Sequence, residues 1–193
     1  MTESPPIVVA VTGASGAPIA WSALRALRAA HAHVSLVLST AAEAVIQEEC
    51  KVPVSEFAKL ATELYDDRDF SAPIASGSRP TQGMLIVPCS SNTLAKIALG
   101  LSDTLITRAA HVHLKERRRL VVVPRETPLS AVQLRHMATL AELGVVVLDA
   151  APPYYLKPKS VSDLVDYVAG KALDHLGVPH RLYRGYRVPP DSE

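Results

Sequence analysis

The sequence lacks the features that mark secreted, membrane-spanning and nucleic-acid-binding proteins. Only Cys50 and Cys89 occur among its 193 residues, so neither a disulfide framework nor a four-cysteine zinc site can be built. No apolar run approaches the roughly 18 residues of a membrane-spanning helix, and the N-terminus lacks the basic start of a signal peptide. With 20 basic and 19 acidic side chains, no charge excess favours nucleic acid or a membrane surface. We therefore expect a cytoplasmic protein that binds neither.

The chain does contain enough apolar material for one hydrophobic core. Hydrophobic residues make up 48% of the sequence, and a domain of about 100 to 200 residues needs no disulfide or metal to be stable. We predict a single domain over residues 1–193 with a short N-terminal arm at 1–6. The C-terminal tail, 180–193, is rich in arginine and tyrosine. We expect it to leave the globule and to pack on another subunit.

Five continuous apolar runs of strand length alternate with longer amphipathic segments. Such runs indicate strands covered on both faces, and their alternation with helices predicts an open, doubly wound, mostly parallel α/β sheet. The expected strands are 7–11, 34–38, 84–87, 120–123 and 145–148, and the expected helices are 18–30, 40–50, 92–117, 130–143 and 160–176. The proline-rich segments 53–81 and 152–158 are expected to be irregular.

A turn of small residues, Thr12–Ala17, follows the first expected strand and leads into a helix. Glycines allow close backbone approach, and the N–H groups at a helix N-terminus attract anions, so the turn is a candidate phosphate site. It matches neither the dinucleotide fingerprint nor the Walker A loop. A tight turn without a ligand is an equally good interpretation. Ser39 follows the second expected strand and lies at the same edge, where open α/β sheets bind ligands.

Polar residues also follow the third expected strand, in the stretch Pro88–Thr93. One such residue suffices to cap a helix, so a run of hydroxyls and an amide suggests a polar ligand surface, although capping remains an alternative. We expect the neighbouring Cys89 to be simply buried.

Basic residues are concentrated later in the chain. Arg108 and Lys115 are seven residues apart, so they share a helical face and are able to bind one anion. The pair Arg125 and Glu126 ends a buried strand, where charge is costly unless it is paired or used, and we favour a function there. The seven histidines form no defensible set of metal ligands.

Together these motifs resemble the UbiX family of flavin prenyltransferases, from about Ile7 to Leu176. The turn after the first strand is weak evidence alone, but Lys-Glu-Arg-Arg followed by Pro-Arg-Glu-Thr-Pro at this spacing is specific. The matching segments are Val11–Ala17, Pro88–Ser90, Arg108–Ala110, Leu114–Arg118, Val123–Pro128, Tyr155 and Ser160–Asp166.

The resemblance implies a metal-free enzyme that joins the dimethylallyl group of dimethylallyl phosphate to N5 and C6 of reduced FMN and releases prenylated FMN. By position, FMN would be held by Gly13, Ala14, Ser15, Ser39, Ser90, Ser91, Asn92, Thr93 and Arg125. The prenyl phosphate would be held by Arg108, Lys115, Tyr155 and Lys171, and the catalytic candidates are Ser15, Glu49 and Glu126. Lys171 stands where well-known members have arginine.

The resemblance further implies a homo-oligomer, a dodecamer built from trimers whose sites draw on neighbouring subunits, and a UbiD-type decarboxylase that receives the product. Two other interpretations stay open. One is an FMN-dependent cysteine decarboxylase, because Ser91–Ala98 resembles a turn of those enzymes, although no histidine lies between His33 and His111. The other is a flavin-binding protein without turnover. The choice between dimethylallyl phosphate and diphosphate also stays open.

Overall fold

A parallel β-sheet forms the centre of the protein. The computed structural model describes residues 4–185, and within that range six strands pair in the order β3-β2-β1-β4-β5-β6, every pair parallel. The strands are β1 (Ile7–Val11), β2 (Val34–Leu38), β3 (Glu63–Asp66), β4 (Gly83–Cys89), β5 (Arg119–Pro124) and β6 (Val146–Val147). This order confirms the doubly wound α/β class.

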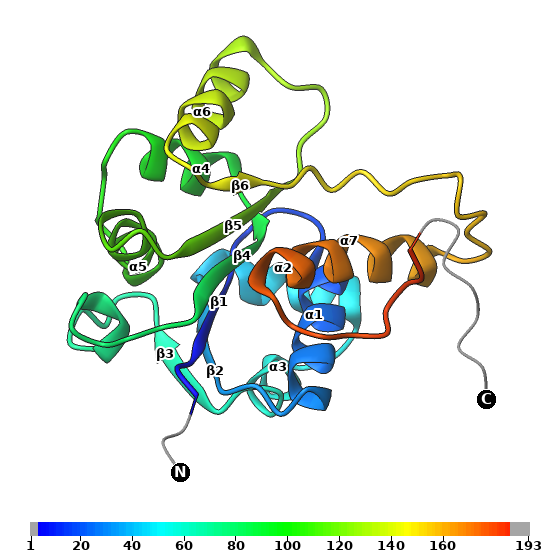
Figure 1. Cartoon of the computed structure of the whole chain (residues 1–193), viewed down its shortest axis with the longest axis horizontal. Coiled ribbons are helices and arrows are strands. Elements are labelled where there is room, and N and C mark those ends of the chain that lie inside the picture. The colour runs from blue at the N-terminus through cyan, green and yellow to red at the C-terminus, as the bar shows by residue number, and fades with distance from the viewer. Residues whose placement is uncertain (1–3, 186–193) are drawn as a thin grey trace.

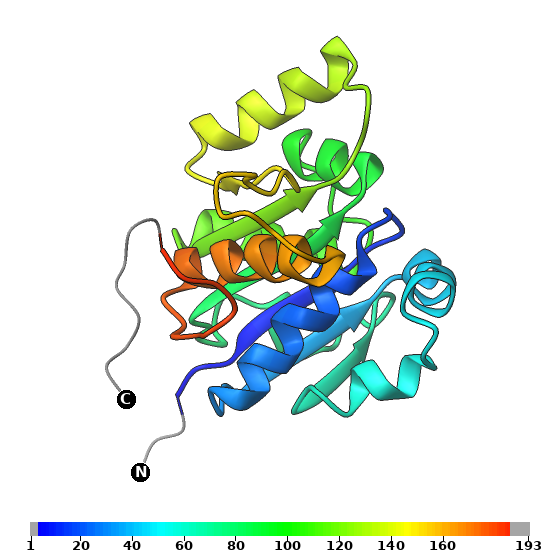
Figure 2. The same cartoon turned by 90° about the vertical axis from the view of Figure 1, so that its right-hand side faces the viewer.

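Helices cover both faces of the sheet, as Figures 1 and 2 show. One face carries α1 (Ala17–Ala29), α2 (Thr40–Cys50), α3 (Val54–Ala58) and α7 (Val161–Leu176). The other carries α4 (Ser91–Ala98), α5 (Leu105–Lys115), α6 (Ala131–Glu142) and the short 3₁₀ helix η1 (Pro73–Ala75). Each layer therefore has its own apolar core against the sheet.

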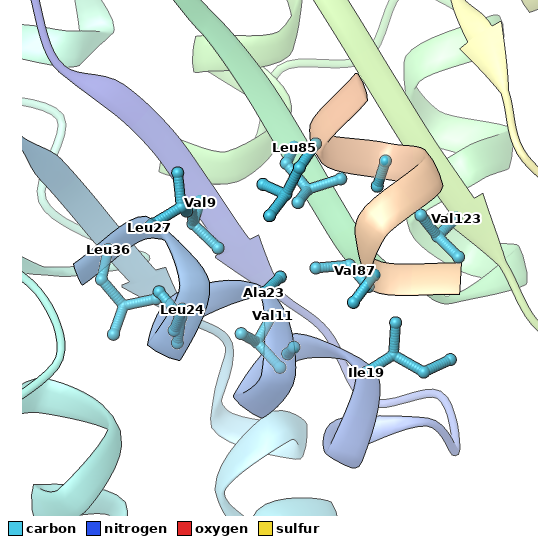
Figure 3. Packing of buried hydrophobic residues seen from close by; sticks show 14 of the residues in the cluster. Val9, Val11, Ile19, Ala23, Leu24, Leu27, Leu36, Leu85, Val87 and Val123 are labelled. Carbon is cyan, nitrogen blue, oxygen red and sulfur yellow. The ribbon is translucent and has the colours of Figure 1, made fainter. Parts of the chain in front are cut away.

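The central strands explain why two layers form. All five residues of β1 are buried; Val9 and Val11 belong to the core under α1 and α7, while Val8 and Ala10 belong to the opposite core. In Figure 3, Leu24 and Leu27 of α1 lie over Val9 and Leu36 of the sheet. A strand that is apolar on both sides is stable only when both sides are covered.

Two sequence-based expectations about secondary structure were wrong. The single helix over 92–117 is two helices, α4 and α5, because Gly100 adopts a φ of 79° and Thr104 caps the new helix that begins at Leu105. The segment 53–81 is not wholly irregular, since it contains α3, β3 and η1. Strand β3 escaped notice because it lies at the sheet edge, begins and ends with the acidic residues Glu63 and Asp66, and has no continuous apolar run.

The described part of the C-terminal tail does not leave the globule as expected. The tail was expected to leave the globule, but residues 180–185 pack against α7, through His180 and Tyr183. Residues 1–3 and 186–193, parts of the expected arm and tail, lie outside the described residues, so an inter-subunit role for the tail stays a prediction. Within residues 4–185 no helix has both the length and the apolar character needed to cross a bilayer.

One buried hydroxyl joins the loops that follow β1 and β4. These neighbouring strands send their following helices, α1 and α4, to opposite faces, which opens a crevice at the carboxyl edge. Thr12, 2% exposed, donates from Oγ1 to the Pro88 carbonyl (2.7 Å) and accepts from the Ser90 N–H (2.7 Å). The Thr12 N–H also donates to the Pro88 carbonyl (3.3 Å).

The substitution Thr12→Val keeps the shape but leaves the Ser90 N–H without its partner. We expect the free energy of unfolding to fall by about 1 to 3 kcal/mol, the cost of an unsatisfied buried donor. Denaturant unfolding at matched subunit concentration measures this. Thr139→Val is the control, because within the described residues that hydroxyl bonds to the Arg135 carbonyl alone, in an exposed contact. Equal stability of the two variants would contradict the bridging role.

Candidate functional site

Two glycines shape the turn after β1. Gly13 leaves room for a neighbouring helix, and Gly16 adopts a backbone conformation that other residues disfavour. A Cβ at Gly13 would lie 2.4 Å from the Ala41 Cβ, so α2 approaches the turn closely. Gly16 has a φ of 122°, a conformation that side chains strongly disfavour. Among residues 4–185 no hydrogen bond engages the N–H groups of Gly13, Ala14 and Ser15. These three donors remain available to a ligand at the carboxyl edge.

The N-terminus of α1 itself is already occupied by a carboxylate. Glu49, near the end of α2, accepts on Oε2 from the N–H groups of Gly16 (2.8 Å) and Ala17 (2.9 Å). The expected use of this helix end for a ligand phosphate therefore needs correction, since the anion at these two donors belongs to the protein. Glu49, expected beside the reacting prenyl group, is held firmly at this edge by the two bonds.

The loop after β4 combines capping with an exposed polar surface. Ser90 caps α4 by accepting from the Thr93 N–H (3.2 Å), and its hydroxyl also contacts the Thr93 hydroxyl. Asn92 is exposed and Ser91 is half-buried. Cys89 is fully buried, and this burial raises the pKa of its thiol to about 12, as expected of an inert core cysteine.

Ser39 is likewise a helix cap, at the start of α2. Its side chain accepts from the Ala42 N–H (3.2 Å), while its own N–H donates to the Val11 carbonyl (3.1 Å). The capping interpretation of Ser39 and Ser90 is therefore confirmed, and both caps lie at the carboxyl edge of the sheet, where a ligand surface stays a prediction.

Residues after β5 complete the site. Arg125 donates from Nε to the Ser15 carbonyl (3.2 Å), which joins the β5 loop to the β1 loop. Glu126 accepts on Oε2 from the Ser91 hydroxyl (3.3 Å) and on Oε1 from the Thr127 N–H (3.2 Å). A cavity of about 300 Å³ lies beside Arg125 and Glu126. One guanidinium and one carboxylate therefore face the edge where the β1 and β4 loops diverge.

Gln133 is a site residue that the sequence analysis missed. Its Oε1 accepts from the Ser130 N–H (2.8 Å) in a capping box at the start of α6. Its Nε2 donates to the Ser91 hydroxyl oxygen (2.8 Å), so the Ser91 proton is left to donate to Glu126. Ser130 followed three residues later by Gln133 is a readable capping signal. Nothing in that signal shows that the amide also reaches Ser91.

The cationic residues expected at the prenyl phosphate do not meet within one chain. Arg108 and Lys115 both lie in α5, on the face of α4 and α6, whereas Lys171 lies in α7 on the other face. Arg108 donates from Nε to the Ala75 carbonyl (3.0 Å), and Lys115 pairs with Glu116 beside Gly77. The sheet separates these two residues from Lys171.

Tyr155 and Lys171, in contrast, belong to one neighbourhood. Tyr155 hydrogen-bonds to Tyr167 of α7, and burial together with this bond raises the pKa of Tyr167. Lys171 is one turn further along the same helix. A hollow of about 770 Å³ lies between α1, α7 and residues 179–182, and Trp21 is among the residues that line it. None of the residues expected to bind FMN lines this hollow, so it is separate from the proposed flavin site.

The groups at this edge suit an anion and a polar ring. Backbone N–H groups, serine hydroxyls and a guanidinium supply donors, and Glu126 supplies a carboxylate. Within residues 4–185 no group of three or more His, Cys, Asp and Glu side chains is placed to hold a metal ion.

Glu49→Ala removes the carboxylate from the α1 N-terminus. We expect the free energy of unfolding to fall by about 1 to 2 kcal/mol, because two N–H groups lose a charged acceptor. Denaturant unfolding measures this, with Glu48→Ala as the control. Glu48 is 83% exposed and, among residues 4–185, pairs with Lys51 alone, so its removal should change stability by less than about 0.5 kcal/mol. Equal losses would argue against the capping role.

Known proteins match this chain over most of its length. The family model described as Flavoprotein matches residues 1–173. The flavin prenyltransferase UbiX of Thermoplasma acidophilum is 52% identical over 178 residues, covering 92% of this chain and 98% of that protein. The UbiX of Methanocaldococcus jannaschii is 42% identical over 178 residues, covering 92% and 96%.

Solved structures agree in fold. The crystal structure of AnUbiX (PadA1) in complex with FMN and dimethylallyl pyrophosphate is 41% identical, with a TM-score of 0.94, and covers 97% of this chain and 100% of that one. A dodecameric FMN-dependent UbiX-like decarboxylase from Escherichia coli O157:H7 is 40% identical, with a TM-score of 0.90, and the match covers 94% and 100%. The chain therefore belongs to the Flavoprotein family and, within it, to the UbiX family.

Proposed function

We propose that this protein is a flavin prenyltransferase, which joins the dimethylallyl group of dimethylallyl phosphate to reduced FMN. The observation that carries the proposal is the 52% identity to a flavin prenyltransferase over 92% of the chain. The 41% identical structure that holds FMN and dimethylallyl pyrophosphate supports FMN and a dimethylallyl donor, and it leaves open the choice between the phosphate and the diphosphate. A cysteine decarboxylase, TvaF, shares the fold at only 17% identity, so it carries no argument for that chemistry.

The carboxyl edge of the sheet fits a flavin mononucleotide. The available N–H groups of Gly13, Ala14 and Ser15 suit a phosphate, as does the Arg125 guanidinium at the same edge. The polar residues that would bind the rest of the flavin are Ser15, Ser39, Ser90, Ser91, Asn92 and Thr93. Reduced FMN supplies the nucleophilic N5 and C6 atoms that accept the prenyl group.

The chain's cations would stabilise the leaving group. Breaking the allylic C–O bond releases phosphate and leaves a delocalised cation, so positive groups must receive the anion. Arg108, Lys115 and Lys171 supply this charge, and the Tyr155 hydroxyl supplies a further donor. Because the sheet separates α5 from α7, we propose that one site takes Arg108 and Lys115 from one copy and Lys171 from another, in a homo-oligomer. A UbiX-like relative is dodecameric.

Ring closure at C6 requires that one proton add to the prenyl double bond and that another leave C6 of the flavin ring. Glu126 is the proposed acceptor, since its carboxylate lies at the carboxyl edge of the sheet, where we propose that the flavin binds, and is oriented by Ser91 and Thr127. The released phosphate is the alternative base. Glu49 would place a second negative charge beside the allylic cation, held there by its two backbone bonds.

The resemblance to the UbiX family supports a proposal for the destination of the product. We propose that prenylated FMN is handed to a UbiD-type decarboxylase. We also propose a cytoplasmic location, because both Cys50 and Cys89 are free thiols, as a reducing compartment maintains them.

The decisive measurement is anaerobic incubation with reduced FMN and dimethylallyl phosphate, followed by mass spectrometry of the extracted flavin. We expect a flavin heavier by one prenyl unit, and no such species when the prenyl donor is omitted. Unchanged flavin despite tight FMN binding would favour a protein without turnover. Release of carbon dioxide from a cysteine-ended peptide would favour a decarboxylase.

A site shared between copies predicts complementation. Lys115→Ala and Lys171→Ala should each be nearly inactive as pure oligomers. Co-assembly of equal amounts should restore about a quarter of the sites, because random mixing pairs an intact Lys115 with an intact Lys171 at that frequency. Turnover of the mixed oligomers measures this, with separately assembled oligomers mixed afterwards as the control. No recovery on co-assembly would show that both lysines come from one chain.

A further inference from the structure

Asp174 of α7 collects three donors from two parts of the chain. Its Oδ2 accepts from the Tyr183 hydroxyl and from Lys171 Nζ (3.4 Å), and its Oδ1 lies 3.1 Å from His180 Nε2. Burial alone would raise the pKa of Asp174, but the bonds from Tyr183, His180 and Lys171 outweigh it and lower that pKa. The carboxylate is therefore ionised, and it ties Lys171 to the C-terminal segment, residues 178–185.

The C-terminal segment lies on α7 so closely that only glycine fits beneath it. A Cβ at Gly170 would be 2.7 Å from both His180 Cε1 and Tyr183 Cδ1. The Tyr183 ring packs on the Tyr167 ring with 4.7 Å between centroids. Tyr167 in turn bonds to Tyr155. The segment thus reaches both α7-side groups assigned to the prenyl phosphate, namely Lys171 through Asp174 and Tyr155 through Tyr167.

The contacts of Asp174 leave Lys171 oriented but not neutralised. The shorter bonds of the carboxylate go to Tyr183 and His180, while its contact with Lys171 is the longest of the three. An ammonium has three N–H donors, of which Asp174 takes one, so two remain for a phosphate. The Lys171 side chain is 34% exposed, which leaves it accessible.

We propose that Asp174 is a positioning residue for the prenyl phosphate site and acts by holding the Lys171 ammonium, with Tyr183 and His180 sharing its charge. An arginine fork is preorganised for phosphate, whereas a lysine is a point charge on a flexible stem. The Asp174 contact restricts that stem, and so supplies part of the orientation that an arginine has by itself. This inference rests on the proposed function for the identity of the phosphate.

Binding of dimethylallyl phosphate to the oligomer loaded with oxidised FMN tests the inference, because no turnover follows. Calorimetry should show the dissociation constant rising about tenfold in Asp174→Asn, as expected for loss of a charge-assisted contact. When Lys171 is already replaced by alanine, Asp174→Asn should alter the dissociation constant of dimethylallyl phosphate less than about twofold, because the two residues act through one contact. FMN affinity should stay unchanged throughout.

Two further variants make the test specific. Asp174→Glu keeps the charge but moves the carboxylate by one methylene, and should also weaken binding only when Lys171 is present. Asp166→Asn is the matched control, because Asp166 lies on the same helix and bonds to Ser22 instead (2.5 Å). The dissociation constant of dimethylallyl phosphate should be the same for Asp166→Asn as for the unmodified protein.

Equal dissociation constants for Asp174→Asn, Asp174→Glu and the unmodified protein would overturn the inference. An equal rise with and without Lys171 would do so too, since Asp174 would then act only on the fold of the C-terminal segment. If the unmodified protein does not bind dimethylallyl phosphate, the inference fails. Binding that shows the expected dependence, without prenylated flavin in the anaerobic assay, would instead leave the inference standing and overturn the proposed function.

Discussion

Burial of β1 and β4 on both faces is the constraint on which the rest of the structure depends. Strands that are apolar on both sides require two helix layers, so the chain leaves β1 for one layer and β4 for the other. The two loops diverge at the carboxyl edge and create a crevice there. Thr12 holds that crevice in shape by bonding both Pro88 and Ser90. Every proposed flavin contact lies on loops or helix starts next to it.

The site is built largely from groups that also stabilise the fold. Ser39 and Ser90 cap helices, Gln133 closes a capping box, and Glu49 neutralises the positive end of α1. Such groups have fixed positions before any ligand arrives, which is the preorganisation that binding and electrostatic catalysis require. A helix cap at this edge is therefore compatible with the proposed ligand site.

The cationic part of the site follows a different logic. Lys115 pairs with Glu116 and Lys171 contacts Asp174, so each lysine is held by a neighbouring carboxylate. Lys115 and Lys171 lie on opposite sides of the sheet, which side chains of this length cannot cross. A site that uses both must be assembled between copies, which makes the proposed catalysis depend on assembly.

The amino-acid sequence by itself determined the layer architecture, because apolar runs and helix caps are local signals; β1 and β2 begin and end where their apolar runs do. It also identified most of the polar residues at the sheet edge, since loops after parallel strands share that edge. Only the tertiary structure decided that Glu49 occupies the α1 N-terminus, that Gln133 reaches Ser91, and that Asp174 joins Lys171 to Tyr183. Those contacts join separate elements, and neither periodicity nor spacing encodes which side chains meet across them.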